Sequence, residues 1–371
     1  LMLIQMQPDA SPQQTGNVRS TLERLGYTTS ALAYLGPCYY AAIPGDECSA
    51  VPEPGLIARL RASGALAGIA ALEPLAGADL AARARKPAGT EVRVGNVVIG
   101  GRAIVIVAGP CSIESREQLQ QTALAVRAAG AHLLRGGAYK PRTSPYAFQG
   151  LGRVGLQLLA EAGSRAGLPV VTEVMAAEDA EVVADYADML QVGARNMQNF
   201  PLLKCLGKLG KPVLLKRSPS ATLEEWLGAA EYLLARGNDQ VVLCERGIRG
   251  FDPNTRNTLD LSAVPALHEL THLPVLVDPS HGTGRRALIP AASRAAVAAG
   301  ADGLCLEVHV RPEESISDRE QALAPADLEA LMPSLTAIAA AVERALHAAR
   351  PRISPERWLP SGDYSTTCRA V

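Results

Sequence analysis

The chain has 371 residues and a formal net charge of -1, with 48% hydrophobic and 20% charged residues. This composition is typical of a globular protein, and the near-zero charge provides no basic field for nucleic acid. No apolar run reaches the roughly 18 residues that a membrane-spanning helix needs, and the N-terminus has no signal-peptide pattern. The seven cysteines are widely spaced and include no C-x-x-C pair. We therefore expect a soluble cytoplasmic protein without disulfides that binds neither nucleic acid nor membrane.

The first part of the chain has the pattern of a small βαββαβ unit. Apolar runs predict four strands, and helix patterns lie between them. This order is typical of a ferredoxin-like domain, a common fold for regulatory ligand-binding modules. We expect this domain at 1–75, followed by a linker at 76–90 that is rich in Ala, Arg, Gly and Pro. The strands are expected at 1–7, 28–35, 39–44 and 66–75, and the helices at 12–25 and 54–62.

From residue 103 onward, short apolar segments alternate with amphipathic helical stretches such as 116–129, 223–236 and 334–350. About eight such units in about 250 residues predict a (β/α)8 TIM barrel, and no G-x-G-x-x-G follows the first strand to favour a doubly wound sheet. Gly95-Asn96 predicts a hairpin at 92–99. We expect the barrel, with this hairpin, at 91–350 and a C-terminal extension at 351–371. The predicted barrel strands are 103–108, 132–135, 169–173, 189–192, 212–216, 240–245, 274–278 and 302–308.

Reactive side chains recur at the ends of these strands, where the chemistry of such a barrel takes place. One set offers a thiolate, an imidazole and two carboxylates, which suits a divalent metal such as Mn, Fe, Co, Zn or Cu. A second set consists of six cations, which would repel one another unless they held phosphate and carboxylate groups. The first set is Cys111, His281, Glu307 and Asp318, and the second is Arg135, Lys140, Arg142, Arg195, Lys216 and Arg246.

Each of these residues has a plainer explanation when it is taken alone. Cys111 could be a small buried apolar residue, and His281 could cap a helix. Glu307 and Asp318 could pair with surface arginines, which contributes little. Coincidence is harder to sustain when ligand residues and cations occupy many strand ends of one barrel.

Five ordered motifs stand at these strand ends: AGPCS at 108–112, KPRTSPY at 140–146, GARNMQ at 193–198, DPSH at 278–281 and SD at 317–318. Together they resemble the 3-deoxy-D-arabino-heptulosonate 7-phosphate (DAHP) synthase family. The Iβ type, which can carry an N-terminal ferredoxin-like domain, is the most similar, and the resemblance covers roughly 1–350. It implies a metal-dependent condensation of phosphoenolpyruvate with erythrose 4-phosphate, the first step of the shikimate route to aromatic amino acids.

The resemblance also implies roles for individual residues. The four residues of the first set would be metal ligands, with Cys111 and His281 acting in catalysis. Lys140 would contact both substrates and transfer a proton, and Glu173 would position a water or a lysine. Phosphoenolpyruvate would be held by Arg135, Lys140, Arg195, Lys216, Arg246 and the Ala194 amide. The phosphate of erythrose 4-phosphate would be held by Arg142, Thr143 and Ser144.

The same resemblance implies a regulated homo-oligomer, a homotetramer. The first domain would dock on the barrel of a neighbouring subunit and close its site when an aromatic amino acid, Tyr or Phe, binds. A domain that serves only stability or assembly is the alternative, because a fold alone does not imply a function.

Three other functions stay open. A 3-deoxy-octulosonate 8-phosphate synthase uses the same chemistry with arabinose 5-phosphate, but its loop resembles Lys-Ala-Asn-Arg-Ser, whereas this chain has Lys140-Pro141-Arg142-Thr143. A Schiff-base aldolase would use Lys216 or Lys140, and cations nearby could lower the lysine pKa, but the metal set would then be unexplained. A non-catalytic sugar-phosphate sensor would not need an intact set of ligands.

Overall fold

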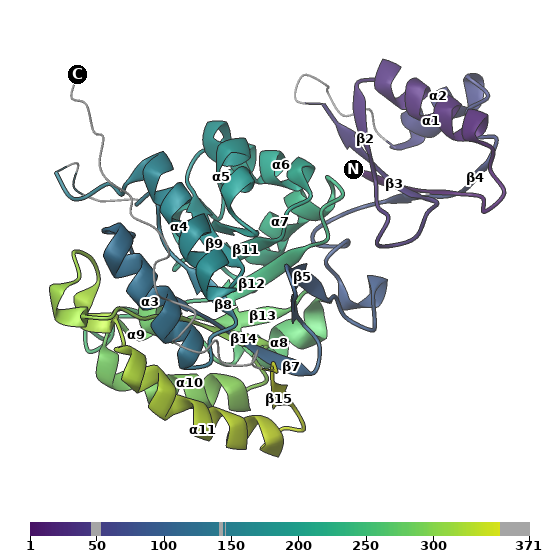
Figure 1. The fold of residues 1–371 in the computed structure, drawn as a ribbon. Coiled ribbons are helices and arrows are strands. Elements are labelled where there is room, and N and C mark those ends of the chain that lie inside the picture. The colour runs from purple at the N-terminus through teal and green to yellow at the C-terminus, as the bar shows by residue number, and fades with distance from the viewer. Residues whose placement is uncertain (46–52, 141–143, 145, 349–371) are drawn as a thin grey trace, which may run out of the picture.

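The computed structural model describes residues 1–45, 53–140, 144 and 146–348 of the chain, and Figure 1 shows two parts. A small sheet with two helices lies beside a larger barrel. Arg142, Thr143 and the extension at 351–371 lie outside the described residues. Within the described residues, no helix is long and apolar enough to cross a membrane.

The N-terminal part has the predicted ferredoxin-like topology. Its four antiparallel strands have the order β2-β3-β1-β4, and the side chains of Met2, Ile4 and Met6 pack on one face with Leu22 and Leu60 of the helices. The first helix begins at a capping box, a strong local signal in the sequence. The elements are β1 (Met2–Met6), α1 (Pro12–Arg24), β2 (Tyr27–Ala31), β3 (Tyr39–Pro44), α2 (Glu53–Ala62) and β4 (Ile69–Pro74).

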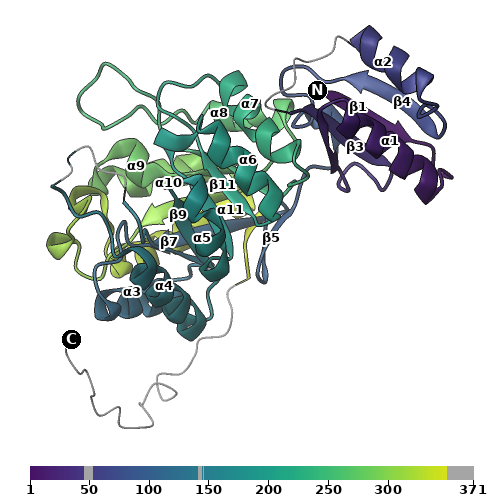
Figure 2. The same cartoon turned by 90° about the horizontal axis from the view of Figure 1, so that it is seen from above.

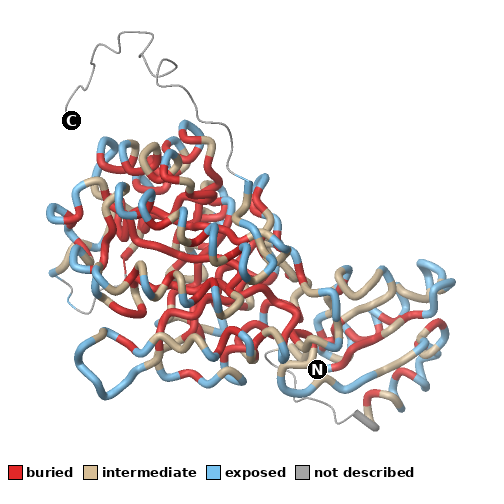
Figure 3. The backbone as a smooth tube through the Cα atoms, turned by 90° about the horizontal axis from the view of Figure 1, so that it is seen from below, coloured by how far each residue is buried: buried red, intermediate tan, exposed pale blue. Residues whose placement is uncertain are grey.

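Eight parallel strands form the closed barrel that the sequence predicts, because the last strand pairs with the first. Each predicted barrel strand agrees with the observed one within one residue at each end. The strands are buried on both faces, which is why they read as continuous apolar runs; Figure 3 shows this burial. They are β7 (Ala103–Gly109), β8 (Leu133–Arg135), β9 (Val170–Val174), β10 (Met189–Val192), β11 (Val213–Lys216), β12 (Val241–Glu245), β13 (Val275–Val277) and β14 (Gly303–Glu307).

Helices surround the barrel strands (Figure 1). They are α3 (Arg116–Ala128), α4 (Gly152–Ala166), α5 (Ala180–Tyr186), α6 (Phe200–Leu209), α7 (Leu223–Leu234), α8 (Ala263–Leu270), α9 (Pro279–Thr283), α10 (Ile289–Ala298) and α11 (Pro325–Ala341).

The predicted hairpin closes one end of the barrel. It consists of β5 (Val92–Val94) and β6 (Val97–Ile99), joined at Gly95, whose φ of +59° suits glycine. The hairpin side chains share a core cluster with inward-facing residues near the strand starts, such as Val105, Val171 and Val242. The hairpin therefore fills the N-terminal end of the barrel and leaves the C-terminal end free for chemistry.

The predicted helix at 334–350 is wrong at both ends. The last helix, α11, spans Pro325–Ala341, and the chain then turns at Glu343, which has a φ of +57°. Residues Ala345–Leu346 form β15, a short strand parallel to the start of β7. The alanine-rich run continues past the helix, so composition alone concealed the turn. Arg344 stabilises the turn by donating to the carbonyl oxygens of Gly300 and Ala301.

The segment at 76–90 packs against the N-terminal end of the barrel. Leu80 and Ala81 are buried, and the Ala81 amide donates to Glu231 Oε1 over 2.7 Å. Leu3 of β1 and Leu32, which follows β2, join the core cluster of the barrel. Figures 1 and 2 both show this sheet on the side of β5 and away from α9. The division of the chain at 75, 90 and 350 remains a prediction.

Glu231 makes this junction sensitive to pH. Burial raises the pKa of its carboxyl to about 7, although backbone hydrogen bonds from Ala81 and Leu80 oppose the shift. A folded-state pKa above the ordinary value means that folding stability is lost as the pH rises from about 4.5 to about 7.

We expect Glu231→Gln to remove this loss. The variant should be more stable than the wild type at pH 8 by roughly 3 kcal/mol, and the difference should vanish near pH 4. Urea denaturation across this range measures it. Glu224→Gln, at an exposed position of the same helix, is the matched control. An unchanged pH dependence in Glu231→Gln would contradict the assignment.

Candidate active site

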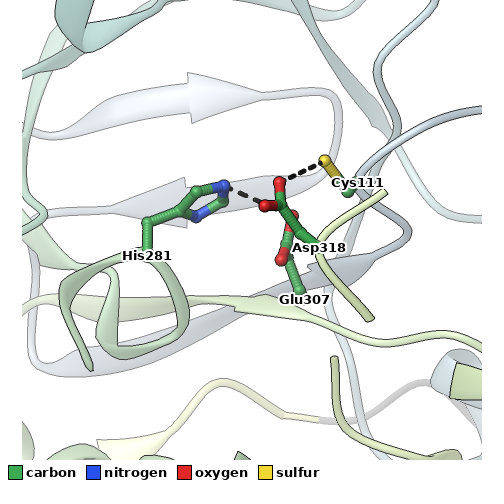
Figure 4. Close-up of side chains that lie close together, drawn as sticks. All are labelled: Cys111, His281, Glu307 and Asp318. Atoms are coloured by element: carbon green, nitrogen blue, oxygen red, sulfur yellow. Dashed lines mark hydrogen bonds and ion pairs between the residues drawn. The ribbon is translucent and has the colours of Figure 1, made fainter. Parts of the chain in front are cut away.

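Four side chains meet at the C-terminal ends of the strands. Cys111 follows β7, His281 lies in α9 after β13, Glu307 ends β14, and Asp318 lies in the loop after β14. Their ligand atoms all lie within 4.8 Å of one another, and Figure 4 shows the side chains directed at one point. Cys111 Sγ is 3.0 Å from Asp318 Oδ2, and His281 Nε2 is 3.3 Å from Glu307 Oε1. The structure therefore brings together the whole predicted ligand set, which we call the metal corner.

The electrostatics of the metal corner favour a bound cation. His281 Nδ1 lies 2.7 Å from Asp278 Oδ2, so its Nε2 faces Glu307. Burial lowers the pKa of His281, but the charges of Asp278 and Glu307 outweigh burial and raise the pKa to about 10. Burial also opposes ionisation of Glu307, yet His281 and Arg135 hold the pKa of Glu307 well below its ordinary range. A proton and a metal ion compete for the same imidazole nitrogen, so surroundings that stabilise one also stabilise the other.

Glu307 gives a second test of the fit to a metal. It is fully buried, and its Oε1 makes no hydrogen bond within the described part of the chain, although His281 Nε2 and Arg135 lie 3.3 and 3.4 Å away. A buried carboxylate oxygen with ion-pair contacts but no hydrogen bond is incompletely satisfied. A divalent metal held by Cys111, His281, Glu307 and Asp318 would satisfy this oxygen and would have a common ligand combination. These residues therefore fit a metal ion.

A cavity of about 610 Å³ opens beside the metal corner. Ser144, Ala194 and His281 line it, and charged side chains make up much of the remaining wall. Among the described residues, the charged lining comprises seven cations and two carboxylates. They are Arg135, Lys140, Arg195, Lys216, Arg246, Arg249 and Arg256, with Glu173 and Asp318. Five of the six predicted cations thus share one cavity, and the sixth, Arg142, lies outside the described residues.

Three of these cations also contact the metal corner or its supports. Lys140 Nζ donates to the Cys111 carbonyl oxygen and lies 3.0 Å from Cys111 Sγ. Arg135 lies 3.4 Å from Glu307 Oε1, and buried Lys216 lies 2.5 Å from Asp278 Oδ2. Burial lowers the pKa of Lys216, but the charge of Asp278 outweighs burial and raises it, so Lys216 stays charged. The cavity and the metal corner therefore form one site.

Two glycines of the sequence motifs allow this close approach. A Cβ on Gly193 would lie 1.9 Å from Glu173 Oε1, so a side chain there would displace Glu173. A Cβ on Gly109 would lie 2.1 Å from the Arg135 carbonyl oxygen, and the φ of Gly109 is +152°. Both positions need glycine because a neighbouring strand end occupies the space of a side chain.

The sequence did not single out several residues of this site. Asp278 belongs to a recognised motif but had no assigned role, and Arg249 had none either. Arg256 lies 3.3 Å from Asp318 Oδ1 and donates to Gln321 Oε1, while Gln321 donates to Glu307 Oε2 over 2.5 Å. The arginine-rich run after β12 could have suggested Arg249 and Arg256, but no local signal marks Gln321.

Arg217 follows Lys216 but does not line the cavity. Its buried guanidinium lies 3.0 Å from both Glu245 Oε2 and Asp260 Oδ2. Glu245 Oε1 in turn accepts a hydrogen bond from the Gly247 amide. Arg217 therefore anchors the start of the loop that carries Arg246.

The comparisons with known proteins agree with this geometry. The family model described as "DAHP synthetase I family" matches residues 81–344, most of the chain. The chain belongs to this family. A phospho-2-dehydro-3-deoxyheptonate aldolase of Thermotoga maritima is 53% identical over 244 residues, which is 66% of this chain and 72% of that protein. A 2-dehydro-3-deoxyphosphooctonate aldolase of Citrifermentans bemidjiense is 33% identical over 273 residues, 68% of this chain and 99% of that protein.

Solved structures lead to the same family. The crystal structure of phospho-2-dehydro-3-deoxyheptonate aldolase (DAHP synthase) from Thermotoga maritima matches with a TM-score of 0.72 at 41% identity. The match covers 93% of this chain and 99% of that chain. A truncated form of the Thermotoga enzyme matches 73% of this chain, with a TM-score of 0.69. The predictions of an enzyme, of the DAHP synthase family and of the barrel with its N-terminal domain are confirmed.

We expect Arg217→Met to destabilise the protein, because it leaves Glu245 buried without its ion-pair partner. Removing one partner of a buried pair costs roughly 3–5 kcal/mol, measurable as a lower free energy of unfolding in urea. The double variant Arg217→Met/Glu245→Gln should recover part of the loss. A wild-type stability in the single variant would show that the pair does not support this loop.

Proposed function

We propose that the enzyme uses a divalent metal to condense phosphoenolpyruvate with erythrose 4-phosphate, giving DAHP and phosphate. The observation that carries the proposal is the contact between the anion cavity and the metal corner, which Lys140 and Arg135 make directly and Lys216 makes through Asp278. Two phosphorylated substrates repel each other, so a catalyst that joins them must neutralise both and hold their reacting carbons together.

The cavity residues supply this neutralisation. We assign phosphoenolpyruvate to Arg135, Lys140, Arg195, Lys216 and Arg246, with the Ala194 amide near its phosphate. We assign the phosphate of erythrose 4-phosphate to Arg142, Thr143 and Ser144. Charged donors fixed before the substrates arrive need no rearrangement during the reaction, which lowers the barrier.

The proposed chemistry begins at the aldehyde. A metal held by Cys111, His281, Glu307 and Asp318 supplies a Lewis acid for the aldehyde oxygen. The electron pair of the C2=C3 double bond of phosphoenolpyruvate forms the bond from carbon 3 to the aldehyde carbon, and Lys140 donates a proton to the aldehyde oxygen. Water then adds to the cationic carbon 2. One proton of this water restores Lys140 and the other leaves with phosphate, which departs by cleavage of its C–O bond. Glu173, which lines the cavity, is proposed to position that water or a lysine.

The electrostatics of Lys216 argue against a Schiff-base aldolase that uses this lysine. A lysine nucleophile must be neutral, but the neighbouring Asp278 raises the pKa of Lys216 and keeps it charged. The complete ligand set likewise argues against a non-catalytic sensor. A set of thiolate, imidazole and carboxylate ligands accepts Mn, Fe, Co or Zn.

The second candidate is the condensation with arabinose 5-phosphate. The 33% identity to a 2-dehydro-3-deoxyphosphooctonate aldolase along 99% of its length supports this alternative. The Lys140-Pro141-Arg142-Thr143 sequence and the higher identity to the Thermotoga enzyme favour erythrose 4-phosphate.

We expect phosphoenolpyruvate consumption and phosphate release to be faster with erythrose 4-phosphate than with arabinose 5-phosphate. Chelation should abolish turnover, and adding Mn, Co or Zn should restore it. Cys111→Ser should lose this restoration, whereas Cys205→Ser, a half-buried cysteine on α6, should retain it. A preference for arabinose 5-phosphate would exclude the first choice, and full activity after chelation would exclude the metal.

We further propose that the N-terminal domain regulates a neighbouring subunit of a homo-oligomer in response to Tyr or Phe. Its position at the N-terminal end of its own barrel supports action on another subunit, because the site opens at the opposite end.

We expect a chain without residues 1–75 to remain active and to lose inhibition by Tyr or Phe. Steady-state assays of both chains with each amino acid measure this, with an unrelated amino acid such as Ala as the control. Inhibition that persists in the shortened chain would rule out a regulatory role for this domain.

A further inference from the structure

Asp318 reaches the metal corner from a loop, not from a strand end. The chain leaves the barrel after Glu307 and returns at Leu323, whose carbonyl oxygen accepts a hydrogen bond from the His309 amide. Within this loop, Asp318 has a φ of +55°, a left-handed conformation that residues other than glycine rarely adopt. The loop must therefore be held from outside for Asp318 to stay beside Cys111.

Glu114, three residues after Cys111, makes contacts that hold this loop. Its Oε1 accepts a hydrogen bond from the Ile316 amide over 2.9 Å and lies 3.2 Å from Ser315 Oγ. Its Oε2 lies 3.5 Å from Nε2 of the buried His309. His309 Nδ1 accepts a hydrogen bond from the Arg311 amide, so the proton is on the nitrogen that faces Glu114. The Glu114 carboxylate thus contacts His309 near the start of the loop, and Ser315 and Ile316 in its middle.

The loop after β7 and the loop after β14 run side by side in opposite directions. Glu114 contacts Ser315, Ser112 Oγ lies 2.7 Å from Ser317 Oγ, and Cys111 Sγ lies 3.0 Å from Asp318 Oδ2. The successive contacts move toward the N-terminus in the first loop and toward the C-terminus in the second. The contact of Glu114 therefore fixes the register that brings Asp318 to Cys111.

We propose that Glu114 is a positioning residue of the metal corner, which acts through Asp318 by setting the register of these two loops. Glu114 is not among the cavity-lining residues, so its effect on the reaction is indirect. This inference rests on the proposed metal-dependent function.

Binding of Co²⁺ to the full-length chain tests the inference. Competition with a chelator gives the dissociation constant, and the thiolate-to-cobalt absorption band reports Cys111 separately from Asp318. We expect Glu114→Ala to weaken Co²⁺ binding by about 10- to 100-fold while the band persists, as for other residues that orient metal ligands. Glu114→Gln should lose less, because its amide oxygen can still accept from the Ile316 amide. Glu313→Ala, an exposed glutamate in the same loop, is the matched control and should bind as the wild type does.

A double-mutant cycle separates positioning from a general effect on folding. If Glu114 acts through Asp318, Glu114→Ala should cause little further loss in an Asp318→Asn background. An equal loss in both backgrounds, or undiminished binding in Glu114→Ala, would overturn the inference. If Glu114→Ala does not fold, Glu114→Gln replaces it in the cycle, and its loss of Co²⁺ binding is again compared between the wild-type and Asp318→Asn backgrounds. A wild type that binds no Co²⁺ would instead overturn the proposed metal dependence, and the inference with it.

Discussion

One buried carboxylate, that of Asp278, joins the two regions of the site. Its Oδ2 lies 2.5 Å from Lys216 Nζ and 2.7 Å from His281 Nδ1. A carboxylate removed from water is stable only where opposite charges and hydrogen bonds replace its hydration, so these three groups can be buried only as a set. Because Lys216 lines the cavity and His281 belongs to the metal corner, this set fixes their relative position. Asp278 therefore holds Lys216, at the end of β11, and His281, just after β13, in one fixed arrangement.

The N-terminal end of the barrel is apolar and the C-terminal end is charged, and the apolar packing supports the charged end. The hairpin around Gly95 fills the N-terminal end with apolar side chains, and Cys244 and Cys305 continue this filling inside the barrel. An apolar interior of low dielectric strengthens the electrostatic interactions beside it. The charged C-terminal end can therefore hold Arg135 and Lys216 with their carboxylate partners in a fixed geometry. The N-terminal domain packs at the apolar end and leaves the charged end open.

Loops contribute a second group of residues that depend on polar contacts for their positions. Asp318 and Arg256 come from the loops after β14 and β12 and lie 3.3 Å apart. Gln321 and Glu114 attach the β14 loop to Glu307 and to the loop after β7. Each contact is a directional hydrogen bond or an ion pair, so the loop geometry is specific although the loop after β14 has only two short 3-10 helices, at Pro312–Glu314 and Arg319–Gln321.

The sequence by itself determined the order of the elements and the chemistry of the strand ends. Apolar runs and capping residues are local signals, and the alternation of strands with helices permits few topologies, so the eight barrel strands could be predicted, as could the meeting of the four candidate ligand residues. The end of α11 could not, because an alanine-rich run continues past the turn at Glu343. Only the tertiary structure decided that Asp278 links Lys216 to His281 and that Glu114 meets Ser315. Lys216 and Asp278 are 62 residues apart in the chain, and Glu114 and Ser315 are 201 apart. No local sequence pattern encodes such contacts.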